Sequence, residues 1–65
     1  MKRRTLIIDF RINGAQQDQH MTEYFFGTSF VRKLVAKAKW NFRMSGVCEM
    51  TAFRPGTGYL TITVR

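Results

Sequence analysis

The stretch "SFVRKLVAKAKWNFR", residues 29–43, combines five basic side chains with no acidic one. When its residues are spaced at about 100° each, as in an α-helix, the apolar side chains fall within an arc of about 140°. This arc holds Phe30, Val31, Leu34, Val35, Ala38 and Phe42. The basic side chains occupy the rest of the circumference. The stretch is therefore predicted to form an amphipathic helix with one apolar stripe that packs against another element.

Trp40 does not fit this division, because the same spacing places its large side chain among the basic residues. Two interpretations stay open at this stage. The indole is exposed on the basic face, or the helix ends near Lys39 and Trp40 turns back to cap the core.

Strand patterns lie on both sides of this helix. Residues 5–12, "TLIIDFRI", alternate between apolar and polar side chains with period two, which is typical of a half-buried strand. Residues 13–20, "NGAQQDQH", have no large apolar side chain and open on Asn-Gly, so they are predicted to form a loop. Residues 47–53 and 59–64 flank "RPGTG", in which Pro55-Gly56 suits the centre of a type II turn, and are predicted to form a hairpin.

The segment "MTEYFF", residues 21–26, is ambiguous. Its aromatic content and the following Gly27 favour a second strand that pairs with the first. The alternative is a longer helix that runs through to Trp40. Gly27 inside that helix would cost about 1 kcal/mol relative to Ala, and Thr28-Ser29 offers a better helix start. The strand is the preferred prediction.

These elements predict an α+β fold in which one amphipathic helix covers one face of an antiparallel sheet of three or four strands. The expected order is strand–strand–helix–strand–strand, or strand–helix–strand–strand if residues 21–26 are helical. The chain of 65 residues is expected to be a single domain, 1–65, with residues 1–4 as a flexible basic arm. Because so short a chain buries little apolar surface, a homodimer is a natural way to add more.

The charge balance points to anionic partners. Eleven Lys or Arg against four Asp or Glu give a net charge of +7, whose positive field suits nucleic acid, ribonucleoprotein, an anionic membrane surface or an acidic protein. The competing interpretation is that the charge only keeps a small protein soluble. The opening residues begin like a signal peptide but fail as one, because Asp9 soon ends the apolar run and no cleavage site of small residues follows. No stretch approaches the ~20 apolar residues of a membrane span, so we expect a cytoplasmic protein without a membrane partner.

Candidates for catalysis are few. His20 and Cys48 are the single His and Cys of the chain, so no intramolecular disulfide can form and no metal site can be proposed. The four acidic residues are scattered, and "GTG" at 56–58 lacks the ending of a phosphate-binding loop. We therefore predict no catalytic residue, no metal and no cofactor, and a chain that is not an enzyme.

Binding of nucleic acid, DNA or RNA, is the more specific expectation. The basic stripe of the helix must face solvent when the apolar stripe faces the sheet, and long cationic side chains in a row suit a phosphate backbone. Trp40 could stack on an unpaired base. The predicted contact residues are Arg32, Lys33, Lys37, Lys39, Trp40 and Arg43 in the helix and Lys2, Arg3 and Arg4 in the arm. The competing interpretation is that these lysines are the ordinary solvated face of an amphipathic helix.

The face of the sheet away from the helix is a second possible contact surface, because the alternation places Phe53 and Tyr59 on it, with Thr51, Thr61, Thr63 and Ile7 nearby. Aromatic side chains there could stack on single-stranded RNA, form a dimer interface, or only stabilise the sheet as cross-strand pairs.

Three functional hypotheses follow. The leading one is a small, basic, non-catalytic, cytoplasmic module that binds nucleic acid through the helix. The alternative is an inhibitor or adaptor, organised like the accessory proteins of phages and mobile elements, that binds a protein or ribonucleoprotein target such as a nuclease or a CRISPR complex. That likeness is one of organisation only. The third is a small RNase-type toxin.

Overall fold

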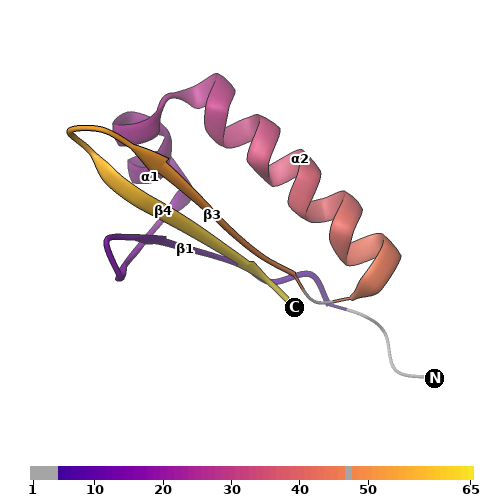
Figure 1. Cartoon of the computed structure of the whole chain (residues 1–65). Helices are drawn as coiled ribbons and strands as arrows, with labels where there is room; N and C mark the ends of the chain where they lie inside the picture. Colours follow the sequence, from indigo (N-terminus) through magenta and orange to yellow (C-terminus); the bar gives the residue numbers. More distant parts are fainter. Residues whose placement is uncertain (1–4, 47) are drawn as a thin grey trace.

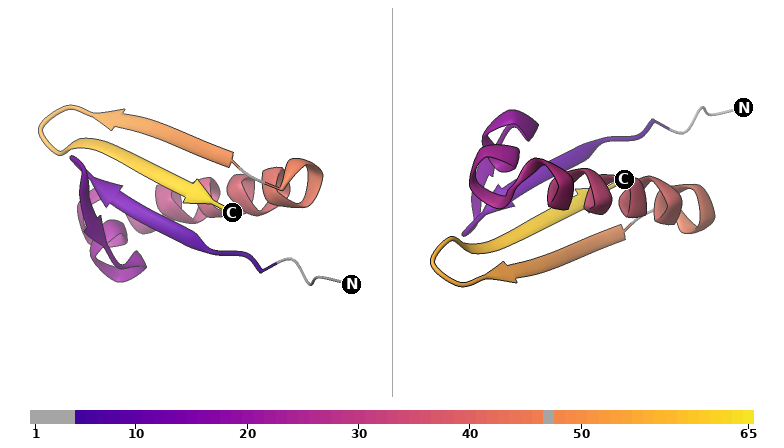
Figure 2. Two further views of the ribbon diagram at one scale, coloured as in Figure 1. Left: turned by 90° about the horizontal axis from the view of Figure 1, so that it is seen from below. Right: turned by 90° about the horizontal axis from the view of Figure 1, so that it is seen from above.

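The computed structural model describes residues 5–46 and 48–65 (Figure 1). The order of elements along these residues is β1 (Ile8–Ile12), β2 (Ala15–Gln17), α1 (Gln19–Phe26), α2 (Thr28–Ser45), β3 (Cys48–Arg54) and β4 (Gly58–Val64). The strands of this part of the chain form one antiparallel sheet in the order β2-β1-β4-β3, and both helices lie on the same face of it (Figure 2). The predicted small α+β fold is confirmed.

The covered face of the sheet is aliphatic. β4 lies between β1 and β3, and each of its inward side chains has a partner on both neighbours. The three rows across the sheet are Ile8–Val64–Cys48, Phe10–Ile62–Met50 and Ile12–Leu60–Ala52. The central members of these rows, on β4, are fully buried. The apolar alternation of the sequence thus determines which face meets the helices.

α2 supplies the other half of the core, and the predicted helix is confirmed. It begins at Thr28 and continues past Trp40 to Ser45, so Trp40 does not turn back toward the core. The predicted apolar stripe faces the sheet through the buried side chains of Val31, Val35 and Ala38. Phe30 is the exception, because it lies at the rim of the core with 40% of its surface exposed.

The strand predicted for residues 21–26 is wrong, because these residues belong to helix α1. Asp18 caps the helix: its carboxylate accepts a hydrogen bond from the Met21 backbone N–H at 2.7 Å. The Thr22 hydroxyl donates to the Asp18 carbonyl at 2.8 Å. Thr22 and Phe26 are one turn apart, and both are buried against the rest of the molecule. A cap and a helical pair of buried residues therefore outweigh the β-propensity of the aromatic side chains.

Gly27 separates the two helices. Its φ of 95° and ψ of 135° lie outside the helical range, so α1 and α2 cannot form one continuous helix. Its N–H still donates to the Glu23 carbonyl at 2.8 Å, and its carbonyl accepts from Val31 at 3.0 Å. The Arg54 guanidinium donates to the Phe26 carbonyl at 2.9 Å, which places a cation at the C-terminal end of α1.

The loop predicted for residues 13–20 is only partly correct. Asn13 and Gly14 have φ values of 52° and 85° and form the turn, as the Asn-Gly signal indicates. The next three residues, however, form β2, which pairs with β1 from Ile12↔Ala15 to Phe10↔Gln17. This strand has no large apolar side chain, so its sequence carries no alternation by which to recognise it.

The second hairpin is confirmed. The Arg54 carbonyl accepts a hydrogen bond from the Thr57 N–H at 3.1 Å, and Gly56 has a φ of 84°, as a type II turn requires. Asn13 ties this hairpin to the first one. Its side-chain oxygen accepts from the Tyr59 N–H at 3.0 Å, and its backbone N–H donates to the Tyr59 carbonyl at 2.9 Å.

Candidate nucleic-acid interface

The outer face of α2, turned away from the sheet, carries the predicted basic side chains. All five are exposed: Arg32, Lys33, Lys37, Lys39 and Arg43. No acidic residue occurs anywhere between Thr28 and Ser45. α2 forms the outer layer of the fold over most of its length, so no other helix or strand of the described residues covers this face (Figures 1 and 2).

Trp40 lies in the middle of this cationic face. In a helix, residues four positions apart lie one above the other, which places Arg32, Ala36, Trp40 and Met44 in one row. Trp40 is 58% exposed and Met44 is 66% exposed, so this row presents apolar surface to solvent. The neighbouring rows bring Lys33 and Lys37 to one side of it and Lys39 and Arg43 to the other.

Arg32 differs from the other four cations, because its Nε lies 3.5 Å from Oε1 of Glu23 on α1. Gln19 also donates to that carboxylate oxygen, at 3.3 Å. Arg32 therefore links the two helices. Because its own side chain is exposed to solvent, the pair contributes only about 0.2–1 kcal/mol. Within residues 5–46 and 48–65 the other four cations have no ion pair. They are the part of the predicted site that remains free to meet a phosphate.

The predicted second surface, the uncovered face of the sheet, is polar with two aromatic side chains. Phe53 and Tyr59 are direct cross-strand partners on it, 74% and 42% exposed. The rows beyond them carry charged side chains at Arg11, Asp9 and Glu49, which alternate with threonines. Aromatic surface is thus confined to the end of this face nearest the turns.

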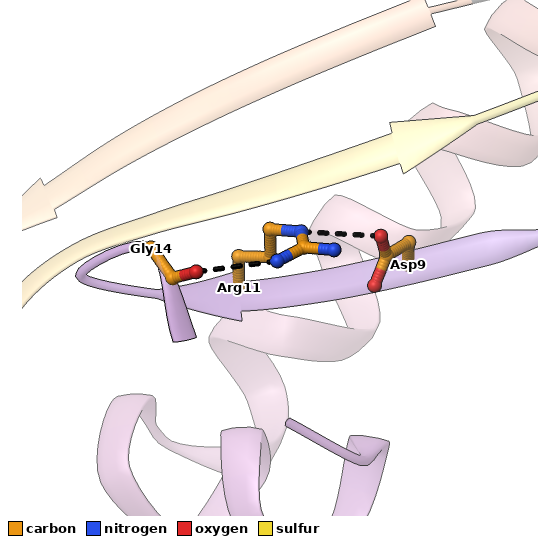
Figure 3. Close-up of polar contacts among 3 residues, drawn as sticks. All are labelled: Asp9, Arg11 and Gly14. Carbon is orange, nitrogen blue, oxygen red and sulfur yellow. Dashed lines mark hydrogen bonds and ion pairs between the residues drawn. The ribbon is translucent and has the colours of Figure 1, made fainter. Parts of the chain in front are cut away.

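Arg11 is a structural cation on this face (Figure 3). Its Nε donates to Oδ2 of Asp9 at 3.3 Å, and its Nη1 donates to the Gly14 carbonyl at 3.2 Å. The side chain thereby holds the turn between β1 and β2. The second oxygen of Asp9, Oδ1, is buried without a hydrogen-bond partner among the described residues.

Three further features of the sequence are the predicted basic arm and the single His and Cys of the chain. Lys2, Arg3 and Arg4, the predicted arm, lie outside the described residues. His20 is exposed in the first turn of α1, while Cys48 is half-buried at the start of β3 and accepts from the Asn41 amide at 3.3 Å. Within the described part of the chain no group of three or more His, Cys, Asp or Glu is arranged to hold a metal ion.

Neither α1 nor α2, the helices of the described ranges, is long and apolar enough to cross a bilayer. Comparison of the chain with protein-family models, with curated protein sequences and with solved structures found no match. The function is therefore argued from the residues of this chain alone.

Proposed function

We propose that this chain binds nucleic acid through the outer face of α2 and catalyses no reaction. The observation that carries the proposal is the exposed indole of Trp40 on a helix face with five cationic and no acidic side chains. Lysines on a helix are explained by solubility alone, but an exposed Trp is not. Exposed Trp with neighbouring Arg and apolar side chains is typical of a contact surface.

The cations have a suitable spacing for phosphates. Lys33 and Arg43 are ten residues apart, which corresponds to about 15 Å along the helix axis at 1.5 Å per residue. That length matches about four steps of a nucleic-acid strand at 3.4 Å each. The unpaired cations Lys33, Lys37, Lys39 and Arg43 would thus neutralise about four phosphates. Arg32 would join them only when a phosphate displaces Glu23.

Trp40 gives the site a preference for unpaired bases. Stacking of a base on an aromatic side chain contributes about 1–3 kcal/mol and tolerates every base, since each has a π-face. A base in a duplex is already stacked on its neighbours and offers no free face. We therefore expect single strands to bind more tightly than a duplex of the same length, with little dependence on sequence. Contacts from Lys2, Arg3 and Arg4 stay a prediction.

Intrinsic fluorescence tests the proposal, because Trp40 is the single Trp of the chain. A single strand and a duplex of equal length are titrated into the protein at two salt concentrations. The proposal predicts a quench for both that weakens with salt, and a deeper quench with the single strand. For the duplex, the log–log plot of affinity against salt should have a slope of about −4 for four neutralised phosphates. A slope near zero, or an unchanged spectrum with no mobility shift, contradicts it.

The inhibitor or adaptor hypothesis needs a different surface. Its supporting observation is the edge of the sheet at β3, a strand that among the described residues pairs with β4 alone. The RNase-type hypothesis stays a prediction to which no described residue is assigned.

A further inference from the structure

The edge of the sheet at β3 is open to pairing. Among the described residues, β3 pairs with β4 alone, over seven consecutive positions from Cys48 to Arg54. Natural edge strands are usually protected by a bulge, a Pro, a Lys or a very short length. The register of β3 has no skipped position, and its sequence, CEMTAFR, contains neither Pro nor Lys. Its two charged residues are Glu49 and Arg54, and Arg54 is engaged with the Phe26 carbonyl. By contrast, the opposite edge, β2, has only three residues.

The period of the ladder identifies the backbone groups at this edge. In β4 the Tyr59 carbonyl accepts from the Asn13 N–H, and Arg65, which follows β4, exchanges backbone hydrogen bonds with Ile7, so both residues bond to the β1 side of the sheet. In an antiparallel ladder, alternate residues bond to opposite neighbours, so the even-numbered residues of β4 bond to β3. Their partners on β3 are also even-numbered. Glu49, Thr51 and Phe53 therefore direct their N–H and C=O groups toward the free edge.

A cavity lies at one end of this edge. It has a volume of about 380 Å³, within the usual range for ligand pockets, and is lined by Phe26, Phe30, Phe53, Arg54 and Pro55. Phe53 belongs to the uncovered sheet face, whereas Phe26 and Phe30 belong to the helix side. The cavity thus lies where the edge of β3 meets the turn after it, and side chains from both sides of the sheet reach it. A strand added to β3 would therefore pass its mouth, and a large apolar side chain could enter.

Positive charge lies along the same edge. Asn41 of α2 donates to Cys48 Sγ at 3.3 Å and lies 3.9 Å from Met50 Sδ, so its side of the helix faces β3. Lys37 and Lys33 precede Asn41 by one and two turns in the same row. A segment added to β3 would lie beside these lysines. An acidic segment gains from that charge, whereas a second copy of this chain would bring a like-charged row against it.

We propose that the free edge of β3 receives an extended, acidic segment of a partner protein as a fifth strand, with one large apolar side chain of that segment in the Phe26–Phe30–Phe53 cavity. Main-chain hydrogen bonds to Glu49, Thr51 and Phe53 hold the segment, and the cavity selects its side chain. This inference shares Lys33 and Lys37 with the proposed nucleic-acid site, but it does not involve Trp40, which lies in a different row of α2.

The probe for the test is a fluorescein-labelled peptide of alternating Glu and Val with one Phe. Its matched control is the same peptide with N-methyl groups on alternate amides, which removes the N–H donors along one edge of the extended peptide and keeps its side chains. Binding is measured by fluorescence anisotropy, and amide chemical shifts of ¹⁵N-labelled protein map the site. The expected result is perturbation at Glu49, Thr51, Phe53 and Phe30, and at least about tenfold weaker binding of the control.

Variants of the protein provide a second, independent test of the same pairing. Thr51→Pro removes a donor that points only to the free edge, where Pro is tolerated, and should weaken peptide binding at least about tenfold. Thr51→Val keeps the donor and should bind within about twofold of the original chain. The peptide with Lys in place of Glu should bind more weakly than the acidic one. Circular dichroism verifies that each variant is folded.

Four results would overturn the inference. Equal binding of the methylated and unmethylated peptides would show that main-chain pairing has no part. Perturbations confined to the outer face of α2 would place the peptide on another site. Absence of binding by the acidic peptide at millimolar concentration would exclude this class of partner. Concentration-dependent sedimentation that Thr51→Pro abolishes would assign the edge to a second copy of the chain.

Discussion

Asn13 connects the two hairpins of this fold at a single residue. Its side-chain oxygen accepts from the Tyr59 N–H at 3.0 Å, and its side-chain nitrogen donates to the Thr57 carbonyl at 3.5 Å. The Cα of Gly58 lies against the side-chain amide of Asn13. Because Gly58 has a φ of 108° and a Cβ there would fall on the Asn13 side chain, only glycine allows both the turn and the contact.

Gly58→Ala is therefore expected to destabilise the chain by about 2–3 kcal/mol, from backbone strain together with loss of the Asn13 hydrogen bonds. The matched control is Gly56→Ala. Its φ is 84°, but a Cβ there meets nothing within 4 Å, so it should cost only about 1–2 kcal/mol. Urea denaturation of both variants measures the difference. Equal losses would show that the contact with Asn13 contributes nothing.

Trp40 shows how far single residues could be predicted. The helical spacing of the sequence places Trp40 among the basic residues, and it is indeed 58% exposed there. The ion pair between Arg32 and Glu23 was not foreseeable, because it joins two helices whose separation depends on the backbone at Gly27. Contacts within one helix follow from spacing, whereas contacts between helices require their relative orientation.

At the scale of elements, α1 depends on its cap. Asp18 accepts from the Met21 N–H and precedes a helix of only eight residues. So short a helix is not stable by propensity alone and needs both its cap and the burial of Thr22 and Phe26. The sequence contains the signal for this cap, because Asp18 precedes Met21 by three positions. The aromatic residues that follow, however, favour a strand.

Asp18→Ala should lower the free energy of unfolding by about 1 kcal/mol, because the first turn of α1 loses its acceptor. Asp18→Asn keeps an acceptor of equal capping strength and should stay within about 0.5 kcal/mol of the original chain. Thermal unfolding followed by circular dichroism tests both. An effect of Asp18→Asn as large as that of Asp18→Ala would mean that the charge of Asp18, and not its cap, is what matters.

Elements whose large apolar side chains recur with the period of a strand or of a helix were predictable from the sequence. β2 has no such pattern and was not predicted. β1, β3, β4 and α2 all carry an apolar face that must be buried, and their patterns predicted them correctly. β2, Ala15–Gln17, is held by backbone pairing with β1 and by the turn at Asn13-Gly14. Because its side chains bury little, its sequence does not distinguish a strand from a loop.

At the scale of the whole molecule, stability depends on one thin layer between the sheet and the helices. A chain of 65 residues is expected to have about 3–10 kcal/mol of total stability. Ile62 lies in β4, an inner strand of the sheet, and has no exposed surface. Ile7, just before β1, is 50% exposed. Because the two side chains are identical and differ in burial, a comparison of their Ala variants measures the effect of burial on stability.

Ile62→Ala should cost about 2–5 kcal/mol, enough to unfold a large fraction of the protein at 37 °C. Ile7→Ala removes the same atoms from a half-exposed position and should cost less than about 1.5 kcal/mol. Chemical denaturation at 25 °C provides both values. Similar losses at the two positions would contradict the assignment of the core.

Binding of nucleic acid could follow from the net charge of +7 of the whole chain or from the proposed contacts on the outer face of α2. Charge removal at matched positions separates the two explanations. Lys33 and Lys39 flank Trp40 on α2, whereas Arg65 follows β4 and pairs with Ile7 through its backbone on the sheet. All three are exposed.

The decisive measurement is the salt dependence of duplex binding for the original chain, for the double variant Lys33→Gln with Lys39→Gln, and for Arg65→Gln. At about 0.9 of slope per neutralised phosphate, the expected slope is about −4 for the original chain and about −2 for the double variant, and Arg65→Gln should leave it unchanged. If the three slopes are equal, or if Arg65→Gln lowers the slope by as much per charge as the helix variants, the outer face of α2 is not the nucleic-acid interface.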